Sequence, residues 1–287
     1  MPVPAATVVP LRAGSEGTEV LMLRRNPEIY FGGAWVFPGG RVDPEDRDTS
    51  TPPPDPDDRD TSTPQPDPDD RDERPQPDPD DRDTSTPQPD PDDRDERPQP
   101  DPDDRDERPQ PDLDDRTVLS RPDLVATARR AAVREAREET GLGLDIASMT
   151  WFAHWLPPGF RPRRFATWFF LAPAPDNPVR IDGGEIHGHR WIRPADALAA
   201  HARGEMELVI PTWVTLHLLA AHPTPEAAIS ALGSGEPMFF HTDLRKTEEG
   251  LVAIWEGDAG YRLPDHDTPG PRRRLTMAGR DWRIEGL

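Results

Sequence analysis

The chain has 287 residues with a formal net charge of -21, and it contains 39 prolines and no cysteine. The negative charge is concentrated in one segment, because residues 45–116 carry 29 of the 55 acidic residues but only 10 of the 34 basic ones. The rest of the chain is therefore close to neutral, holds nearly all of the apolar side chains, and is long enough to form a full hydrophobic core.

This composition excludes several classes of protein. Without cysteine there is no disulfide framework, no thiol nucleophile and no metal site with cysteine ligands. No apolar run reaches the roughly 18–20 residues of a membrane span, and the N-terminal residues lack the basic and apolar regions of a signal peptide. The near-neutral remainder gives no reason to expect nucleic-acid binding. We therefore expect a cytoplasmic protein that binds neither a membrane nor a nucleic acid.

The N-terminal part of the chain is predicted to form strands. Residues 5–11 and 19–24 are apolar-rich runs, and Asn26 and Pro27 supply a turn after the second run. Residues 32–40 predict a further short strand that ends in the glycine pair Gly39 and Gly40.

Residues 45–116 repeat a unit of 11 or 12 residues that reads D-D-R-D-E-R-P-Q-P-D-P or a close variant. Its frequent prolines prevent helices and sheet ladders and favour extended chain, and its low hydrophobicity and like charges predict disorder. The run D-P-D-D-R-D resembles part of a calcium loop but lacks the turn glycine and the closing glutamate that an EF-hand requires. We interpret the segment as a disordered, solvated linker produced by tandem duplication.

After the repeat, residues 121–140 predict one long helix, with Ser120 as its N-cap and Gly141 as its C-terminal stop. The elements expected beyond it are strands at 150–155, 166–171 and 189–192, helices at 194–202 and 211–221, and strands at 238–241, 251–255 and 274–277. Mixed strands and helices of this kind predict a layered α+β domain.

Three glutamates near the end of the long helix carry the chemistry. Glu135, Glu138 and Glu139 are spaced i, i+3, i+4, so they share one helix face. The apolar residues Leu124, Ala128, Ala131 and Ala132 project on the same side, whereas Arg129, Arg130 and Arg137 are expected on the opposite side. Carboxylates that converge at a core edge repel one another unless a cation lies between them, and oxygen ligands suit Mg²⁺ or Mn²⁺.

The same residues resemble a known family. The run from Arg134 to Leu142 is similar to the second half of the Nudix box, G-x5-E-x7-R-E-U-x-E-E-x-G-U, and Gly39-Gly40 after Phe37-Pro38 resembles its first half. Residues 189–198 are like the strand and helix that commonly close Nudix domains. The resemblance implies an α+β fold of the Nudix type, an α/β/α sandwich with a mixed sheet, here with the acidic insertion and a small C-terminal β extension.

The box is interrupted at its first glutamate. Six residues after Gly40 comes Asp46, and eight before Arg134 comes Ala126, so Asp46, Glu45, Asp123 or no residue fills this position. An interruption here, together with residues 35–43, 163–165 and 211–216, resembles the branch of peroxisomal acyl-CoA diphosphatases and their actinobacterial relatives. The resemblance predicts a Nudix domain split between residues 1–44 and 117–221, the insertion at 45–116, and a C-terminal extension at 222–287.

The resemblance implies a metal-dependent pyrophosphohydrolase that cleaves a diphosphate linkage in a nucleotide derivative, with coenzyme A or acyl-CoA as the first substrate to test. The alternatives are a nucleotide-sugar or dinucleotide (NADH, ADP-ribose) pyrophosphatase, or a non-catalytic nucleotide-binding module. The partner is then a small nucleoside-diphosphate-type molecule, and a homodimer is compatible with the family. The implied metal (Mg²⁺ or Mn²⁺) ligands are Glu135, Glu138 and Glu139.

Further site residues follow from their positions. Arg134 is expected to orient the carboxylates, and Glu138 is expected to act in catalysis as well as in metal binding. Gly39, Gly40 and Arg164 are the candidate substrate-binding residues, and Glu185, in the loop before the strand at 189–192, is the candidate general base. The remaining candidates are expected to be non-functional. We expect the aromatic residues Trp151, Trp155 and Phe160 to lie in the core and His187 and His189 to be surface or packing residues. We expect Arg272–Arg274 to form a solvated cluster.

Overall fold

The computed structural model describes residues 2–28, 32–47, 113, 115–159, 164–181 and 183–287. The prediction of disorder for residues 45–116 lies outside the described residues except at the two ends of that segment. There the chain is structured, because Glu45 to Arg47 belong to the 3₁₀ helix η1 (Pro44–Arg47), Leu113 is buried, and α1 (Arg116–Leu119) begins at the last residue of the segment.

A mixed eight-stranded sheet forms the centre of the fold, with the strand order β3-β2-β1-β6-β5-β8 and with β4 and β7 paired to β1 and β2. The pairs β1–β6 and β5–β8 are parallel and the others antiparallel, which confirms the mixed sheet. Its strands are β1 (Val3–Gly14), β2 (Gly17–Arg25), β3 (Trp35–Val36), β4 (Gly39–Arg41), β5 (Thr150–Leu156), β6 (Phe165–Pro173), β7 (Ile186–Ile192) and β8 (Met238–His241).

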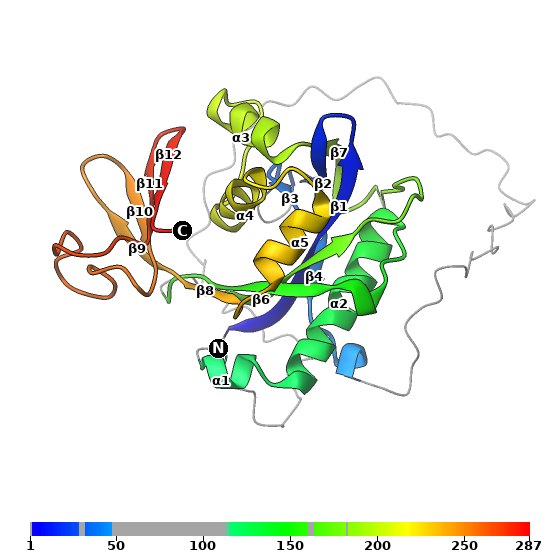
Figure 1. Cartoon of the computed structure of the whole chain (residues 1–287), viewed down its shortest axis with the longest axis horizontal. Coiled ribbons are helices and arrows are strands. Elements are labelled where there is room, and N and C mark those ends of the chain that lie inside the picture. The colour runs from blue at the N-terminus through cyan, green and yellow to red at the C-terminus, as the bar shows by residue number, and fades with distance from the viewer. Residues whose placement is uncertain (1, 29–31, 48–112, 114, 160–163, 182) are drawn as a thin grey trace, which may run out of the picture. The chain divides into compact units, whose positions relative to one another are not determined.

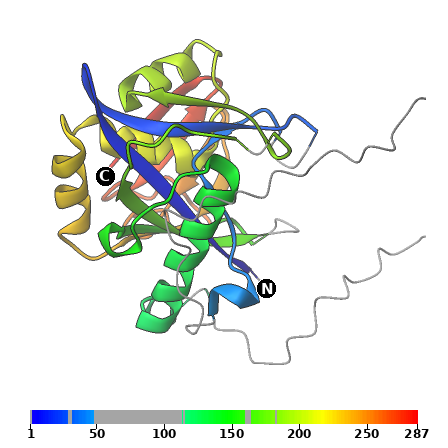
Figure 2. The same ribbon diagram turned by 90° about the vertical axis from the view of Figure 1, so that its right-hand side faces the viewer.

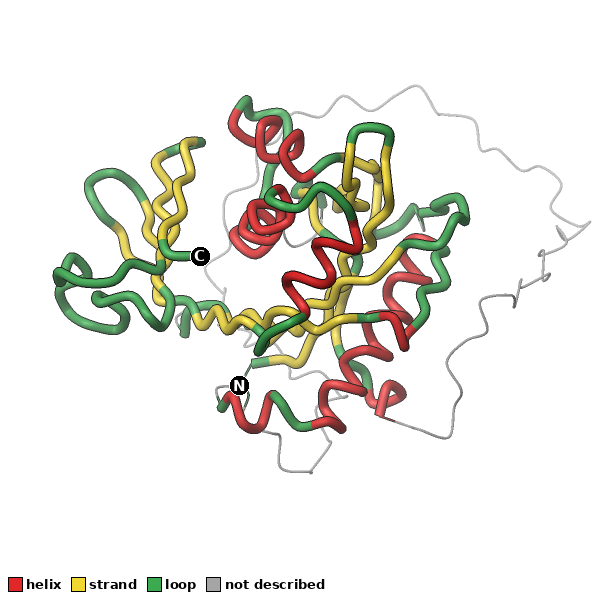
Figure 3. Tube along the Cα trace, in the orientation of Figure 1, coloured by secondary structure: helices red, strands yellow, loops and turns green. Residues whose placement is uncertain are grey.

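Helices cover both faces of this sheet (Figures 1 and 3). The long helix α2 (Pro122–Thr140) packs its alanines against Ala6, Val8 and Leu23 on one face. On the other face, a second core gathers side chains of β1 and β2 with α3 (Pro194–Ala202), α4 (Ile210–Ala220) and α5 (Pro225–Gly233). Figure 2 shows α2, in green, lying alongside the long blue strands. This confirms the predicted α/β/α layering.

Most predicted elements are confirmed to within one to three residues. The helix at 121–140 begins at Pro122, and Gly141 ends it in the left-handed conformation with φ 70°, as a glycine stop requires. Ser120 as the N-cap is wrong, because Ser120 ends α1 and Arg121 occupies the cap position without a side-chain cap. The short elements α1, η2 (Ile146–Ser148), α5 and the two further C-terminal strands β9 and β12 were not predicted.

The C-terminal residues form a second sheet, in the order β12-β11-β10-β9. Ala253, Trp255 and Leu275 of this part are buried in the core shared with α3 and α4. The strands are β9 (Asp243–Lys246), β10 (Leu251–Ile254), β11 (Arg274–Ala278) and β12 (Asp281–Glu285).

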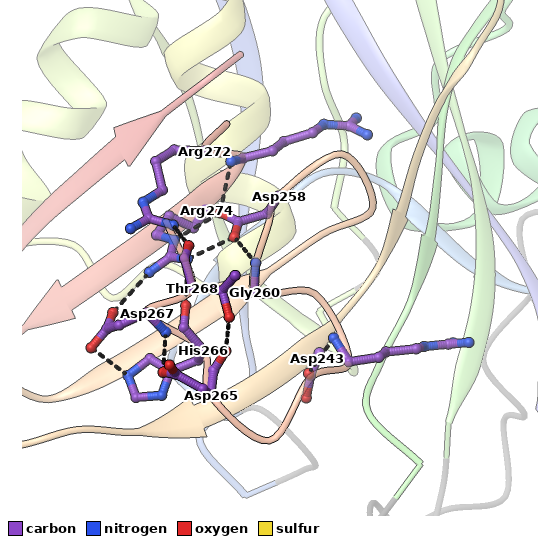
Figure 4. Close-up of polar contacts among 11 residues, drawn as sticks. Asp243, Asp258, Gly260, Asp265, His266, Asp267, Thr268, Arg272 and Arg274 are labelled. Atoms are coloured by element: carbon purple, nitrogen blue, oxygen red, sulfur yellow. Dashed lines mark hydrogen bonds and ion pairs between the residues drawn. The ribbon is translucent and has the colours of Figure 1, made fainter. Parts of the chain in front are cut away.

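A buried ion pair organises the loop between β10 and β11 (Figure 4). Arg274 donates to both oxygens of Asp258, at 2.7 and 2.6 Å, and also to the carbonyl of His266. Asp258 accepts two backbone N–H bonds as well, from Gly260 and Arg273. The expectation that Arg272–Arg274 form a solvated cluster is therefore wrong for Arg274, which is buried because the loop wraps around its guanidinium.

No helix among the described residues is both long and apolar enough to span a membrane.

Candidate active site

Helix α2 presents its three glutamates at different depths. Glu139 is buried, Glu135 is half-buried, and the side chain of Glu138 is 57% exposed. The predicted buried stripe of Ala128, Ala131 and Ala132 is confirmed, and Glu135 and Glu139 continue it. Glu138, one residue before Glu139, lies at the solvent edge of the same helix end.

The prediction that Arg129 and Arg130 lie opposite the apolar stripe does not hold for their charged ends, which reach back to other parts of the fold. The guanidinium of Arg129 lies 5.8 Å from the ring centroid of Phe170, a buried side chain of β6. Arg130 donates to the backbone carbonyl of Asp46 at 2.6 Å. Long arginine side chains can reach back over the edge of a helix to neighbouring groups, so helical periodicity alone misplaces their charged ends.

The glycine pair lies directly against two of the glutamates. The backbone N–H of Gly39 donates to Oε2 of Glu139 at 2.9 Å. A Cβ atom added to Gly40 would lie 2.2 Å from Oε1 of Glu135, which is far inside van der Waals contact. Gly39 is equally constrained, because its Cβ would lie 2.4 Å from the carbonyl oxygen of Ala6. The backbone of β1 therefore requires glycine at position 39, whereas at position 40 the missing side chain lets the carboxylate of Glu135 lie against β4.

Arg134 joins the carboxylates on both sides of the insertion. Its Nη1 lies 3.1 Å from Glu135 Oε1 and 3.1 Å from Glu138 Oε2. Its Nε and Nη2 donate to Asp46 at 3.2 and 3.0 Å, and Nη2 also lies 3.3 Å from Asp43. Burial alone would lower the pKa of Arg134, but the Asp46 bond and the surrounding carboxylates raise it overall.

Of the residues considered for the interrupted position, the structure brings Asp46 to Arg134. Asp46 is buried in η1, where its Oδ2 also accepts the backbone N–H of Asp43. Glu45 next to it is exposed, and Asp123 pairs instead with Arg121 at the start of α2. The short 3₁₀ turn rotates Asp46 inward, a detail that the spacing in the sequence did not decide.

The electrostatics of the two inner glutamates favour a nearby cation. Burial, together with the charge of Glu135, raises the pKa of Glu139 to about 8, although the Gly39 N–H bond opposes the shift. Burial also raises the pKa of Glu135, against the opposing effect of Arg134. Two carboxyl groups with raised pKa values at one edge are held there at an energetic cost unless a positive charge joins them.

The donor chemistry fits a hard divalent cation. Glu135, Glu138 and Glu139 offer oxygen atoms only, which are the ligands that a hard divalent cation prefers. Within the described part of the chain, no three acidic or histidine side chains converge closely enough to hold a metal ion by themselves. Water or substrate phosphate oxygens would therefore have to complete the coordination, which is the usual arrangement for Mg²⁺.

Two other predicted residues lie at different distances from this cluster. Glu185 lies close enough to raise the pKa of Glu139, and its Oε2 lies 3.5 Å from the guanidinium of Arg25. Arg164 precedes β6, where its backbone carbonyl accepts the N–H of Val3. Among the described residues, no hydrogen bond or ion pair connects the Arg164 side chain with the three glutamates.

The residues expected to be structural or solvated are largely confirmed as such. Trp155 is buried and stacks on Phe240 at 4.1 Å, and Trp151 is half-buried against Phe239. His187 and His189 are exposed. Phe160 lies outside the described residues.

Comparison with known proteins finds one matching family model and several similar folds. Residues 123–213 match the family model of the NUDIX domain, and a search of curated proteins found no match. The fold is similar to the crystal structure of a NUDIX hydrolase from Alicyclobacillus acidocaldarius, with a TM-score of 0.51 and 21% identity over 82% of this chain and 98% of that chain.

More distant likenesses concern proteins with the same domain name. The NUDIX domain of Shewanella oneidensis NrtR, complexed with ADP ribose, has a TM-score of 0.41 and 12% identity over 76% of this chain and 85% of that one. A MutT NUDIX hydrolase from Burkholderia pseudomallei has a TM-score of 0.39 and 14% identity over 76% and 97%. Residues 123–213 of this chain thus match the NUDIX domain model, and the chain shares its fold with the Alicyclobacillus enzyme.

Proposed function

We propose that this protein is a divalent-metal-dependent hydrolase that cleaves the diphosphate linkage of a nucleotide derivative. The observation that carries the proposal is the contact between the end of α2 and β4. There, Glu139 accepts a hydrogen bond from Gly39, and Glu135 lies against Gly40. Arg134 forms an ion pair with the neighbouring Glu138. A helix with three solvated glutamates would leave Glu139 exposed, whereas Glu139 is buried and accepts the backbone N–H of Gly39.

In this proposal, Glu135, Glu138 and Glu139 hold Mg²⁺ or Mn²⁺. The bound cation would neutralise the diphosphate oxygens and lower the pKa of water for attack on phosphorus. Arg134 orients Glu135 and Glu138 through charge-assisted hydrogen bonds. Asp46 in turn accepts a hydrogen bond from Arg134 and holds its guanidinium in place. Gly39 and Gly40, the proposed substrate-binding residues, let the carboxylates of Glu139 and Glu135 lie against the backbone of β4.

We further propose Glu185 as the general base. Its carboxylate is 66% exposed, lies beside Arg25, and contributes to the electrostatic field at Glu139, so it lies near the carboxylate cluster while remaining accessible to water. A Glu185→Gln variant should lower kcat by about 100-fold while leaving KM within about twofold, since general-base catalysis contributes about 100-fold or more. A kcat within threefold of wild type would assign the base elsewhere.

The substrate is proposed from the resemblance of residues 35–43 to the acyl-CoA diphosphatase branch. The test is release of the phosphate-containing products from CoA, acyl-CoA, NADH and ADP-ribose, each with Mg²⁺, with Mn²⁺ and with a chelator. Metal-dependent cleavage of one substrate in this set supports the proposal. Binding of a nucleotide without cleavage of any of them would support a non-catalytic nucleotide-binding module instead.

A further inference from the structure

Besides Arg134, a second arginine lies near the carboxylate cluster. It is Arg25, the last residue of β2. Its Nη2 lies 3.5 Å from Oε2 of Glu185, and its positive charge opposes the burial that raises the pKa of Glu139. Among the described residues, Arg134 forms ion pairs with two of the three glutamates of α2 but not with Glu139. Arg25 is therefore the cation that serves this part of the cluster.

Strand alternation brings Arg25 to the α2 face of the sheet. Leu23 packs in the core on that face, so Arg25, two residues further along β2, points to the same side. On the partner strand β7 the pairing skips one residue, because Arg24 lies opposite Gly188 whereas Arg25 lies opposite Ile186. Bulges of this kind re-aim side chains and are frequent beside active sites.

The end of β2 also holds the loop that carries Glu185. The backbone N–H of Asn26 donates to the carbonyl of Glu185 at 2.8 Å, and its side-chain Nδ2 donates to the carbonyl of Gly184 at 3.1 Å. Arg25 is fixed in turn, because its own N–H donates to the carbonyl of Ala34 at 3.0 Å. The side chains of Arg25 and Glu185 therefore start from backbone segments that are already joined.

Arg25 lies near two carboxylates that repel each other. Beyond burial and the charge of Glu135, the charge of Glu185 also raises the pKa of Glu139, as like charges do. The Glu185 side chain is largely exposed, so water offers its carboxylate a place away from Glu139. The guanidinium of Arg25 attracts both carboxylates and offsets their repulsion.

The fold gains little stability from this arginine. Its Nε is buried and, among the described residues, has no hydrogen-bond partner. A buried donor without a partner destabilises a fold. The contact of Arg25 with the exposed Glu185 is long, at 3.5 Å, and exposed ion pairs contribute little. Stability alone therefore does not explain an arginine at this position.

We infer that Arg25 is a positioning residue for the proposed general base, holding the Glu185 carboxylate toward Glu139 and the metal site. This inference rests on the proposed function, because it explains how the same hydrolase keeps its base beside its metal ligands. Arg25 acts through Glu185 and contacts neither the substrate nor the reacting atoms. The 3.5 Å separation agrees with this role, since hydrogen bonds around catalytic groups are often long before substrate binds.

The direct test is a double-mutant cycle on kcat, with the full-length protein, Mg²⁺ and a candidate substrate that the wild type cleaves. Arg25→Gln should lower kcat about tenfold and leave KM within threefold. The double variant Arg25→Gln/Glu185→Gln should be no slower than Glu185→Gln alone, because Arg25 acts through Glu185. Losses that multiply in the double variant, or a higher KM with unchanged kcat in Arg25→Gln, would overturn the inference.

The matched control is Arg24→Gln, which removes the same charge from the neighbouring, exposed residue and should keep kcat and KM. Arg25→Lys restores the charge and should recover at least threefold in kcat over Arg25→Gln, and equal rates for the two would overturn the role of the charge. The melting temperature of metal-free Arg25→Gln should equal or exceed that of the wild type, whereas a purely structural arginine predicts a lower one. If Arg25→Gln does not fold, Arg25→Lys replaces it, with a kcat about threefold lower than the wild type and no loss in the Glu185→Gln background.

Mn²⁺ binding without substrate separates this inference from the proposed function. Loss of a positive charge near Glu139 should make Arg25→Gln bind Mn²⁺ at least threefold more tightly, whereas Arg24→Gln should change the affinity less than twofold. Unchanged or weaker Mn²⁺ binding in Arg25→Gln would overturn the inference. If the wild type cleaves a substrate but Arg25→Gln keeps kcat within twofold, the hydrolase proposal stands and the inference fails. If the wild type binds Mn²⁺ but cleaves none of the candidates, the hydrolase proposal fails and Arg25 keeps only its place beside the carboxylates.

Discussion

Two arginines of this molecule, Arg134 on α2 and Arg274 on β11, are each surrounded by carboxylates in a different way. Arg274 is buried and donates from Nε and Nη2 to both oxygens of Asp258, whose remaining bonds come from backbone N–H groups, while Nη1 reaches Asp267 at 3.5 Å. These bonds outweigh the effect of burial and lower the pKa of Asp258 to about 2. The pair is complete, which is the pattern of a structural ion pair.

Around Arg134 the carboxylates outnumber the cation. One partly exposed guanidinium is shared among Asp43, Asp46, Glu135 and Glu138. Glu139, beside them, accepts a backbone N–H from Gly39 and has a raised pKa. Unbalanced negative charge of this kind costs stability, and it persists where a ligand supplies the missing positive charge. The proposed metal site and the structural ion pair therefore differ in the balance between carboxylates and guanidiniums.

The largest expected effect is on catalysis. Glu138→Gln removes one proposed metal ligand, so kcat should fall by about 100-fold or more, corresponding to about 3 kcal/mol of transition-state stabilisation. Because Glu138 is exposed, the melting temperature of the metal-free protein should change little. Asp123→Asn, at the exposed start of the same helix, is the matched control and should retain activity. Full activity in Glu138→Gln would remove it from the site.

The reverse result is expected at the other arginine. Asp258→Ala leaves the buried charge of Arg274 with only the long contact to the exposed Asp267, at 3.5 Å, so the free energy of unfolding should fall by about 3–5 kcal/mol. Below the unfolding transition, the specific activity should remain close to that of the wild type. Asp281→Ala breaks the exposed pair with Arg283 and should cost less than about 1 kcal/mol in urea denaturation. Equal costs for the two variants would contradict the distinction drawn between them.

Asp46 offers a direct test of how the interrupted box is completed. Asp46→Asn weakens the hydrogen bonds that hold the Arg134 guanidinium in place. Activity should therefore fall by about tenfold, the loss typical of residues that orient ligands. A Glu45→Gln variant in the same 3₁₀ helix should behave as the wild type. If both variants retain full activity, Asp46 does not fill the position of the first glutamate.

The raised pKa of Glu139 predicts a particular pH dependence. Since the folded-state pKa of about 8 lies above the ordinary value of 4.5, metal-free protein should lose stability relative to Glu139→Gln as pH rises from about 4.5 to 8. The difference should change on the order of 1 kcal/mol per pH unit and become constant above pH 8. Saturating Mg²⁺ should reverse this trend, as followed by urea denaturation. A pH-independent difference would refute the shift.

The smallest effect is expected from the acidic repeat. Replacing residues 50–110 by a short glycine-serine linker removes no residue of either arginine network, so stability and kcat should change little. Leu113→Ala should be more costly, about 2–3 kcal/mol, because Leu113 is 3% exposed in the core beside α2. Loss of Mg²⁺ affinity on replacement of residues 50–110 would show that the repeat contributes to the site.

Periodic and local patterns in the sequence determined much of this protein. Alternating and helical apolar patterns placed the main strands and α2 to within a few residues, and Gly141 marked the end of α2. The spacing of Glu135, Glu138 and Glu139 singled out the acidic end of α2. These features depend on backbone geometry within a few residues, so a single sequence contains them.

Tertiary structure alone decided which distant groups meet. It brought Asp46 to Arg134 across the insertion, turned Arg129 onto Phe170 and buried Arg274 against Asp258. It also brought Arg25, at the end of β2, to Glu185 in the loop before β7. The physical reason is that side-chain burial and pairing depend on strand register and on loop closure over long separations. The negative charge of the whole chain predicts none of these contacts, because it belongs mainly to the repeat.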